Sequence, residues 1–147
     1  MSAYLLDVNV MLALSWPGHK SHSSAQKWFG RNASKGWATC PMVEAGFVRI
    51  LSNPAFSTRA VSATEAIAAL EISTKHPLHG FWPDDISLVG GLANLQDRIR
   101  GHQQITDAYL LALAIQHQGK LATLDKRLAA FVAEGNGVER SHLELIE

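Results

Sequence analysis

The chain has 147 residues, 47% of them hydrophobic and 18% charged, and its 13 basic and 13 acidic side chains leave no formal net charge. This length predicts a single domain over residues 1–147, and the longest apolar run, Ala108 to Ile115, is too short to span a bilayer. The lone cysteine, Cys40, excludes an internal disulfide and a cysteine metal cluster, and predicts a small buried apolar side chain. No basic residue precedes the first apolar run, which contains an acid, so we expect no secretory signal and a cytoplasmic protein.

The first apolar run, Tyr4 to Val10, predicts a strand buried on both faces of a parallel sheet. Asp7 stands in its middle. A buried carboxylate is costly unless it is paired, hydrogen-bonded or bound to a metal. Asp7 therefore either faces a ligand at the carboxyl end of the strand, where open α/β sheets bind ligands, or caps a following helix from Val8 to Leu14. Local sequence leaves both readings open.

The next part of the chain predicts a helix, a strand and a second helix. A helix containing Ala25, Trp28 and Phe29 follows the Pro17-Gly18 turn, and Gly36 to Cys40 predicts a short strand. Pro41 suits the first position of a helix that ends before Asn53-Pro54. Glu44 lies in the first turn of this helix, where an acid either complements the helix dipole or has a chemical role.

The second half of the chain repeats this alternation. Ser62 and Glu65 match a capping box, and Asp84-Asp85 predict the cap of a later helix. The expected strands and the most hydrophobic helix are short runs, namely Phe81-Trp82, Lys120 to Leu124 and Leu143 to Ile146 for the strands and Ile105 to Ile115 for the helix. Asp107 enters the interior in the first turn of that helix, and Asp125 directly follows a strand, as Asp7 does.

Alternating strands and helices predict an α/β sandwich with a mainly parallel sheet. Asp7 and Asp125 would then emerge at carboxyl ends of strands, and Glu44 and Asp107 could point to the same edge. Four carboxylates without basic partners repel one another unless cations are present. Oxygen ligands favour Mg²⁺ or Mn²⁺ over zinc.

Such ions activate water and stabilise in-line attack at phosphorus, so phosphodiester hydrolysis is the predicted chemistry. Thr106, Thr123 and Asn9 could orient carboxylates or a phosphate by hydrogen bonds. Between Asp7 and Glu65 the only acid is Glu44, and the basic residues there would either make a locally positive surface for a polyanion or be ordinary solvated side chains. These basic residues are Lys20, Lys27, Arg31, Lys35, Arg49 and Arg59.

The four acidic motifs resemble those of PIN-domain nucleases, and the whole chain resembles the VapC toxins of bacterial type II toxin–antitoxin systems. The motifs are Leu-Leu-Asp7-Val-Asn-Val, Pro-Met-Val-Glu44-Ala-Gly-Phe, Ile-Thr-Asp107-Ala-Tyr and Ala-Thr-Leu-Asp125. The resemblance implies a three-layer α/β/α sandwich with four to five strands in its central sheet. It also implies a Mg²⁺- or Mn²⁺-dependent endoribonuclease, usually a homodimer, that a VapB-type antitoxin inhibits. Asn9 and Thr123 match further polar positions of the family.

Two other functions are compatible with these patterns. A haloacid-dehalogenase-like phosphatase also places Asp after an apolar strand, but it needs a second Asp where this chain has Asn9, and an amide is no general acid. A domain that keeps the fold and binds RNA or a partner without cleaving is the non-enzymatic alternative. Loss of RNA cleavage in folded Asp7 and Asp107 variants would separate this alternative from a nuclease.

Overall fold

The computed structural model describes residues 3–56, 61–135 and 137–147, so Arg59 lies outside the described residues. Within them the chain forms a five-stranded sheet in the order β3-β2-β1-β4-β5, and all four pairings are parallel. The strands are β1 (Tyr4–Leu6), β2 (Trp37–Thr39), β3 (His79–Phe81), β4 (Lys120–Thr123) and β5 (Leu143–Leu145). The predicted parallel sheet is confirmed, including Leu143 to Leu145 as an edge strand.

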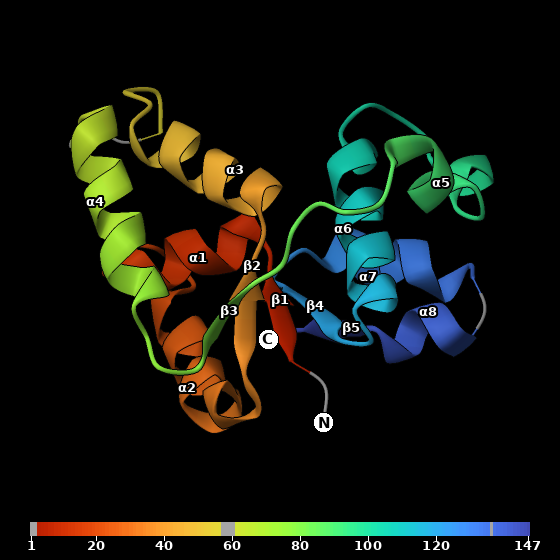
Figure 1. Ribbon diagram of the computed structural model, residues 1–147, viewed down its shortest axis with the longest axis horizontal. Helices are drawn as coiled ribbons and strands as arrows, with labels where there is room; N and C mark the ends of the chain where they lie inside the picture. Colours follow the sequence, from red (N-terminus) through yellow and green to blue (C-terminus); the bar gives the residue numbers. More distant parts are fainter. Residues whose placement is uncertain (1–2, 57–60, 136) are drawn as a thin grey trace.

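Helices cover both faces of the sheet. The α-helices are α1 (Val8–Ser15), α2 (His22–Asn32), α3 (Pro41–Leu51), α4 (Ala63–Thr74), α5 (Leu88–Leu92), α6 (Gln104–Gln116), α7 (Lys126–Ala133) and α8 (Gly137–Ser141), and short 3-10 turns η1 (Ala33–Lys35) and η2 (Gln96–Arg98) join them. Figure 1 shows α1 to α4 on one side of the sheet and α5 to α8 on the other. The predicted three-layer α/β/α sandwich is therefore confirmed.

The core lies where the central strands meet α6. All three residues of β1 are buried, and α6 is buried continuously from Ala108 to Ala114, as its nearly all-round apolar sequence predicts. Cys40 is fully buried, which confirms its apolar role, and burial raises the pKa of its thiol to about 12. None of the helices in the described ranges combines the length and apolar character that a bilayer crossing requires.

The first strand is shorter than the apolar run predicts. It ends at Leu6, and Asp7 adopts an extended conformation as the N-cap of α1, accepting a hydrogen bond of 2.7 Å from the Val8 N–H. This bond satisfies one of the unpaired amides that open every helix, so the helix begins one residue after Asp7. The predicted cap is therefore confirmed, and Asp7 also stands at the carboxyl end of a strand, so the cap does not exclude a ligand there.

Asp84 and Asp85 do not cap α5, so that prediction is wrong. The N-cap is Ser87, whose hydroxyl accepts a hydrogen bond of 3.0 Å from the Gly90 N–H. Asp84 accepts instead from the Met42 N–H at the start of α3 (3.2 Å), and Asp85 pairs with His117 (3.3 Å). Tertiary partners outcompete the local cap here. The capping box of Ser62 and Glu65 at α4, by contrast, is confirmed.

The strand order contains a switch point between β1 and β4. From β1 the chain proceeds outward to β2 and β3 and then returns to β4 on the other side of β1. The connections after β1 and β4 therefore diverge, which leaves a crevice at the carboxyl ends of these strands in open α/β sheets. Asp7 directly follows β1, and Asp125 follows β4 after one intervening residue, so both acids lie at this switch point.

Candidate active site

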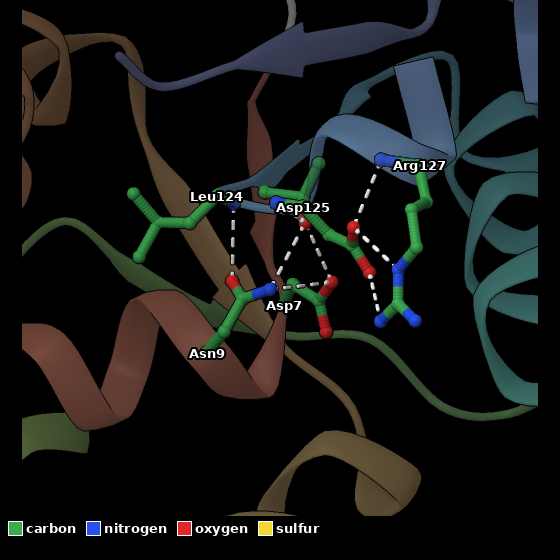
Figure 2. A network of polar contacts seen from close by, with 6 residues as sticks. Asp7, Asn9, Leu124, Asp125 and Arg127 are labelled. Atoms are coloured by element: carbon green, nitrogen blue, oxygen red, sulfur yellow. Dashed lines mark hydrogen bonds and ion pairs between the residues drawn. The ribbon is translucent and has the colours of Figure 1, made fainter. Parts of the chain in front are cut away.

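Asp7 is 6% exposed and is held by three donors at the switch point. Its Oδ1 accepts from the Val8 N–H, and its Oδ2 accepts from the Thr123 hydroxyl at 2.8 Å and from the Asn9 amide at 3.5 Å. Figure 2 shows the Asn9 side chain, from the first turn of α1, turned toward the Asp7 carboxylate. The carboxylate therefore has a fixed orientation before any ligand arrives.

Thr123 joins the first and last acidic motifs. Its side chain is fully buried, and besides donating to Asp7 its hydroxyl oxygen accepts from the Asp125 N–H (3.1 Å) and from the Asn9 amide (3.2 Å). The side-chain oxygen Oδ1 of Asn9 in turn accepts from the Leu124 N–H (3.2 Å; Figure 2). Asn9 and Thr123, both singled out from the sequence, thus tie the loop after β4 to the start of α1.

Asp125 has a basic partner, Arg127. The prediction of four acids without basic partners is therefore wrong for this residue. It is the N-cap of α7 and accepts hydrogen bonds from the backbone N–H, the Nε and the terminal nitrogen of Arg127, at 2.9, 3.2 and 3.1 Å. These bonds hold the pKa of Asp125 below its usual range. Figure 2 shows the Asp125 carboxylate turned toward the Arg127 side chain, which is largely exposed.

Asp107 is coupled electrostatically to the other two aspartates. It lies in the first turn of α6, and burial, followed by the charges of Asp7 and Asp125, raises its pKa to about 6, with Arg127 opposing the shift. Burial also raises the pKa of Asp7, and the Asp125 charge adds to that rise, while the bonds from Thr123 and Val8 lower it. The structure therefore brings Asp7, Asp107 and Asp125 into one centre of unfavourable negative charge.

Glu44 is held by a separate group of residues. The Thr39 hydroxyl donates to Glu44 Oε2 at 2.6 Å and lies 2.7 Å from His79 Nε2. A hydroxyl has one hydrogen, so when that hydrogen is given to Glu44, the His79 Nε2 must be the donor in the second bond. The neighbouring charges that mainly shift the pKa of Asp107 are those of Asp7, Asp125 and Arg127. Glu44 is not one of them.

Sequence reasoning missed Thr39 and His79. Thr39 is fully buried and had one available signal, a hydroxyl in an apolar strand two residues before a helix start. His79 had none, because it reaches Thr39 only through the pairing of β2 with β3, which sets Thr39 opposite Phe81 and Trp37 opposite His79. Thr106, which the sequence did single out, is exposed in α6 and makes no hydrogen bond with the four acids within the described residues.

A cavity of about 390 Å³ adjoins the aspartate centre. Asp107 and Asp125 form one part of its wall, and the remaining lining comes from the loop before α6 and from α7. This second part includes Arg100, His102, Gln103, Gln104, Arg127 and Phe131. The cavity thus continues from the carboxylates into a region of basic, amide and aromatic groups.

The donor set suits a hard divalent cation. Among the described residues no three His, Cys, Asp or Glu side chains gather closely enough to enclose a metal by themselves. Mg²⁺ does not need such a cage, because it commonly binds one or two carboxylates and completes its shell with water and substrate phosphate oxygens. Burial is the main cause of the raised pKa values of Asp7 and Asp107, neighbouring carboxylates add to it, and a bound cation would favour the charged form of both groups.

The model of the PIN domain family matches residues 4–133, which include the whole sheet except its edge strand β5. Ribonuclease VapC39 of Mycobacterium tuberculosis (strain H37Rv) is 47% identical over 133 residues, which cover 89% of this chain and 94% of that protein. Ribonuclease VapC38 of the same strain is 43% identical over 121 residues, covering 82% and 84%.

The crystal structure of VapBC2 from Rickettsia felis bound to a DNA fragment from their promoter shares the fold, with a TM-score of 0.65, 14% identity and 99% coverage of each chain. The chain belongs to the PIN-domain family, in its VapC group. The resemblance inferred from the four acidic motifs is therefore confirmed.

Proposed function

We propose that this protein is a metal-dependent endoribonuclease, the toxin of a type II toxin–antitoxin system, and that its whole length is one PIN domain acting in the cytoplasm. The carrying observation is the cluster of three mutually repelling aspartates at the switch point of the sheet. Its relatives at 47% and 43% identity bear the name ribonuclease. The catalytic residues in this proposal are Asp7, Glu44, Asp107 and Asp125.

Asp7 and Asp107 are the residues that would hold Mg²⁺ or Mn²⁺ directly, with Glu44 and Asp125 acting through water. Asp125 suits the indirect role because Arg127 already occupies both of its carboxylate oxygens. When bound, such an ion supplies positive charge to a phosphodiester and lowers the pKa of a water molecule. The acids would thus bind the cation whose positive charge assists hydrolysis at phosphorus.

The surrounding residues keep these acids in place. The Thr123 hydroxyl fixes Asp7 Oδ2 and leaves less rotational freedom to be lost when substrate binds. The Thr39 hydroxyl likewise fixes Glu44 Oε2, and His79 Nε2 lies within hydrogen-bond distance of that hydroxyl. Arg127 places a guanidinium on the rim of the centre, where it can contact a phosphate when it leaves Asp125.

A VapB-like antitoxin is the proposed protein partner, and a homodimer the proposed assembly. The support is membership of the VapC group together with the fold shared with the VapBC2 structure. RNA is the proposed substrate because the relatives are ribonucleases.

The test is cleavage of a defined RNA by the purified chain with Mg²⁺ or Mn²⁺ and with chelator. We expect metal-dependent cleavage that falls by at least a hundredfold in Asp7→Asn and Asp107→Asn proteins. Asp97→Asn is the matched control, because Asp97 is an exposed acid in η2 that neither lines the cavity nor is among the main charges acting on Asp107. Circular dichroism would establish that each variant is folded. Cleavage that persists undiminished in both folded site variants would contradict the proposal.

A further inference from the structure

The cavity beside the aspartates has an apolar side that the carboxylate chemistry does not use. Leu128 and Phe131, from α7, line it and are otherwise buried, at 3% and 5% exposure. Their exposed edges give this side of the cavity a small apolar contact surface, and RNA-binding proteins commonly place bases against apolar and aromatic side chains. The cavity volume of about 390 Å³ falls within the range of small-ligand sites.

Arg98 holds the aromatic wall in position. Its guanidinium carbon lies 4.8 Å from the centroid of the Phe131 ring, and one terminal nitrogen donates to the Phe131 carbonyl oxygen at 2.9 Å. The other terminal nitrogen pairs at 2.5 Å with Glu139, whose side chain is 9% exposed. The ring is therefore fixed by a buried ion pair behind it, which lowers the ordering cost of binding a ligand in front.

The loop before α6 adds polar groups to the cavity. The Gln104 side-chain oxygen accepts from the Arg100 N–H at 2.6 Å, which shapes the loop and commits Gln104 to it. Gln103 lines the cavity and is exposed, so its amide can donate to and accept from a base edge. Arg100 and Arg127 bring guanidinium groups to the same space, and guanidinium groups bind phosphate oxygens well.

The position of the cavity beside the acids determines which nucleotide of a bound RNA could enter it. Asp107 and Asp125 belong both to the aspartate centre and to the wall of this cavity. An RNA whose phosphodiester lies at the centre would therefore place an adjoining nucleotide against the cavity. A small apolar contact, an amide and two arginines correspond to the base ring, the base edge and the phosphates of that nucleotide.

We propose that the cavity bounded by Gln103, Leu128 and Phe131 is a base-specific subsite for the nucleotide next to the cleaved phosphodiester. In it Gln103 reads the base edge, while Arg100 and Arg127 contact phosphates. This inference rests on the proposed ribonuclease function and adds to it the residues that select the cleavage sequence.

The test is cleavage of an RNA pool randomised around the scission point, with cleavage positions read by sequencing. The intact chain should prefer certain bases at one position beside the cut. Gln103→Ala should reduce that preference roughly tenfold and leave preferences at other positions unchanged. Arg100→Gln should raise KM for all sequences alike, because phosphate contacts carry no sequence information.

Arg31→Gln is the matched control, since Arg31 is an exposed residue of α2, on the opposite side of the sheet. It should leave both KM and the base preference unchanged, because Arg31 does not line the cavity. Affinity for short RNAs of different sequence, measured by fluorescence anisotropy in chelator, provides a second readout independent of cleavage. An intact chain that binds with a Gln103-dependent base preference and does not cleave would overturn the proposed function alone. Cleavage or binding whose base preference survives Gln103→Ala would overturn the subsite, as would absence of RNA binding.

Discussion

The folded protein holds the Asp107 carboxyl in surroundings that disfavour its charged form. In the unfolded chain its pKa is near the ordinary 3.8, and in the folded chain burial and two neighbouring aspartates raise it to about 6. The folded protein therefore binds more protons than the unfolded chain between these two values. By linkage, the contribution of this group to the free energy of unfolding rises as pH falls through about 6.

We predict that Asp107→Asn stabilises the metal-free protein at pH 8, because the amide has no charge to be buried and none to repel Asp7 and Asp125. The gain should be on the order of 2 kcal/mol, allowing for partial exposure of the carboxyl. It should begin to shrink as pH falls through about 6, where the native Asp107 becomes protonated, and approach zero only near pH 3.8, where the unfolded chain is protonated as well. Urea unfolding of both proteins in chelator at several pH values measures this difference. A constant difference across that range would contradict the assigned pKa.

Other residues of the site were beyond sequence analysis for physical reasons. The Arg127 to Asp125 pair was present two residues apart in the sequence, but its bonds depend on Asp125 adopting the extended N-cap conformation. His79 meets Thr39 across two strands that are 40 positions apart in the chain. A single sequence contains the residue types but no pairing register, so such contacts remain invisible in it.

At the scale of elements, strand and helix existence was predictable and several boundaries were not. The long apolar helix α6, the proline start of α3 and the capping box of α4 each follow from a local pattern that no tertiary contact opposes. The end of β1 and the start of α5 depend on which side chain caps the helix, Asp7 in one case and Ser87 in the other. Several polar residues near each boundary could have done so, and packing selects among them.

One hydroxyl, that of Thr123, makes three of the polar contacts among the residues that follow β1 and β4, so we predict a large effect of Thr123→Val. Valine keeps the shape but removes the Thr123 donor to Asp7, leaves the Asp125 N–H without its acceptor, and takes one of two acceptors from the Asn9 amide. The free energy of unfolding should fall by about 2 kcal/mol, and RNA cleavage should fall about tenfold or more because Asp7 loses its fixed orientation.

Thr106→Val is the control for this change, since Thr106 is exposed and has no bond to the acids within the described residues. Its free energy of unfolding should stay within about 0.5 kcal/mol of the parent value. Denaturant unfolding and initial cleavage rates measure both variants. Equal stability of the two valine variants would show that the Thr123 network does not join these strands.

For the whole molecule, zero net charge conceals a strongly uneven distribution. The crossing of the chain from β3 to β4 returns it beside β1, and this topology gathers acids from positions 7, 107 and 125 at one edge of the sheet. This repulsion lowers the stability of the folded protein. A protein with no other use for this edge of the sheet would be more stable without the repulsion. Such a conflict between local stability and the overall fold is expected at a functional site.

We therefore predict that Mg²⁺ or Mn²⁺ stabilises the intact chain by binding the folded state alone. At a hundred times the dissociation constant the gain is about 2.7 kcal/mol, which corresponds to a rise of several degrees in Tm for a domain of this size. The rise should be larger at pH 8 than at pH 5, because protonation of Asp107 competes with the cation. In a protein carrying both Asp7→Asn and Asp107→Asn the rise should disappear, whereas Asp97→Asn should retain it. Differential scanning calorimetry with and without the ion measures these shifts, and an equal rise in the double variant would place cation binding elsewhere on the molecule.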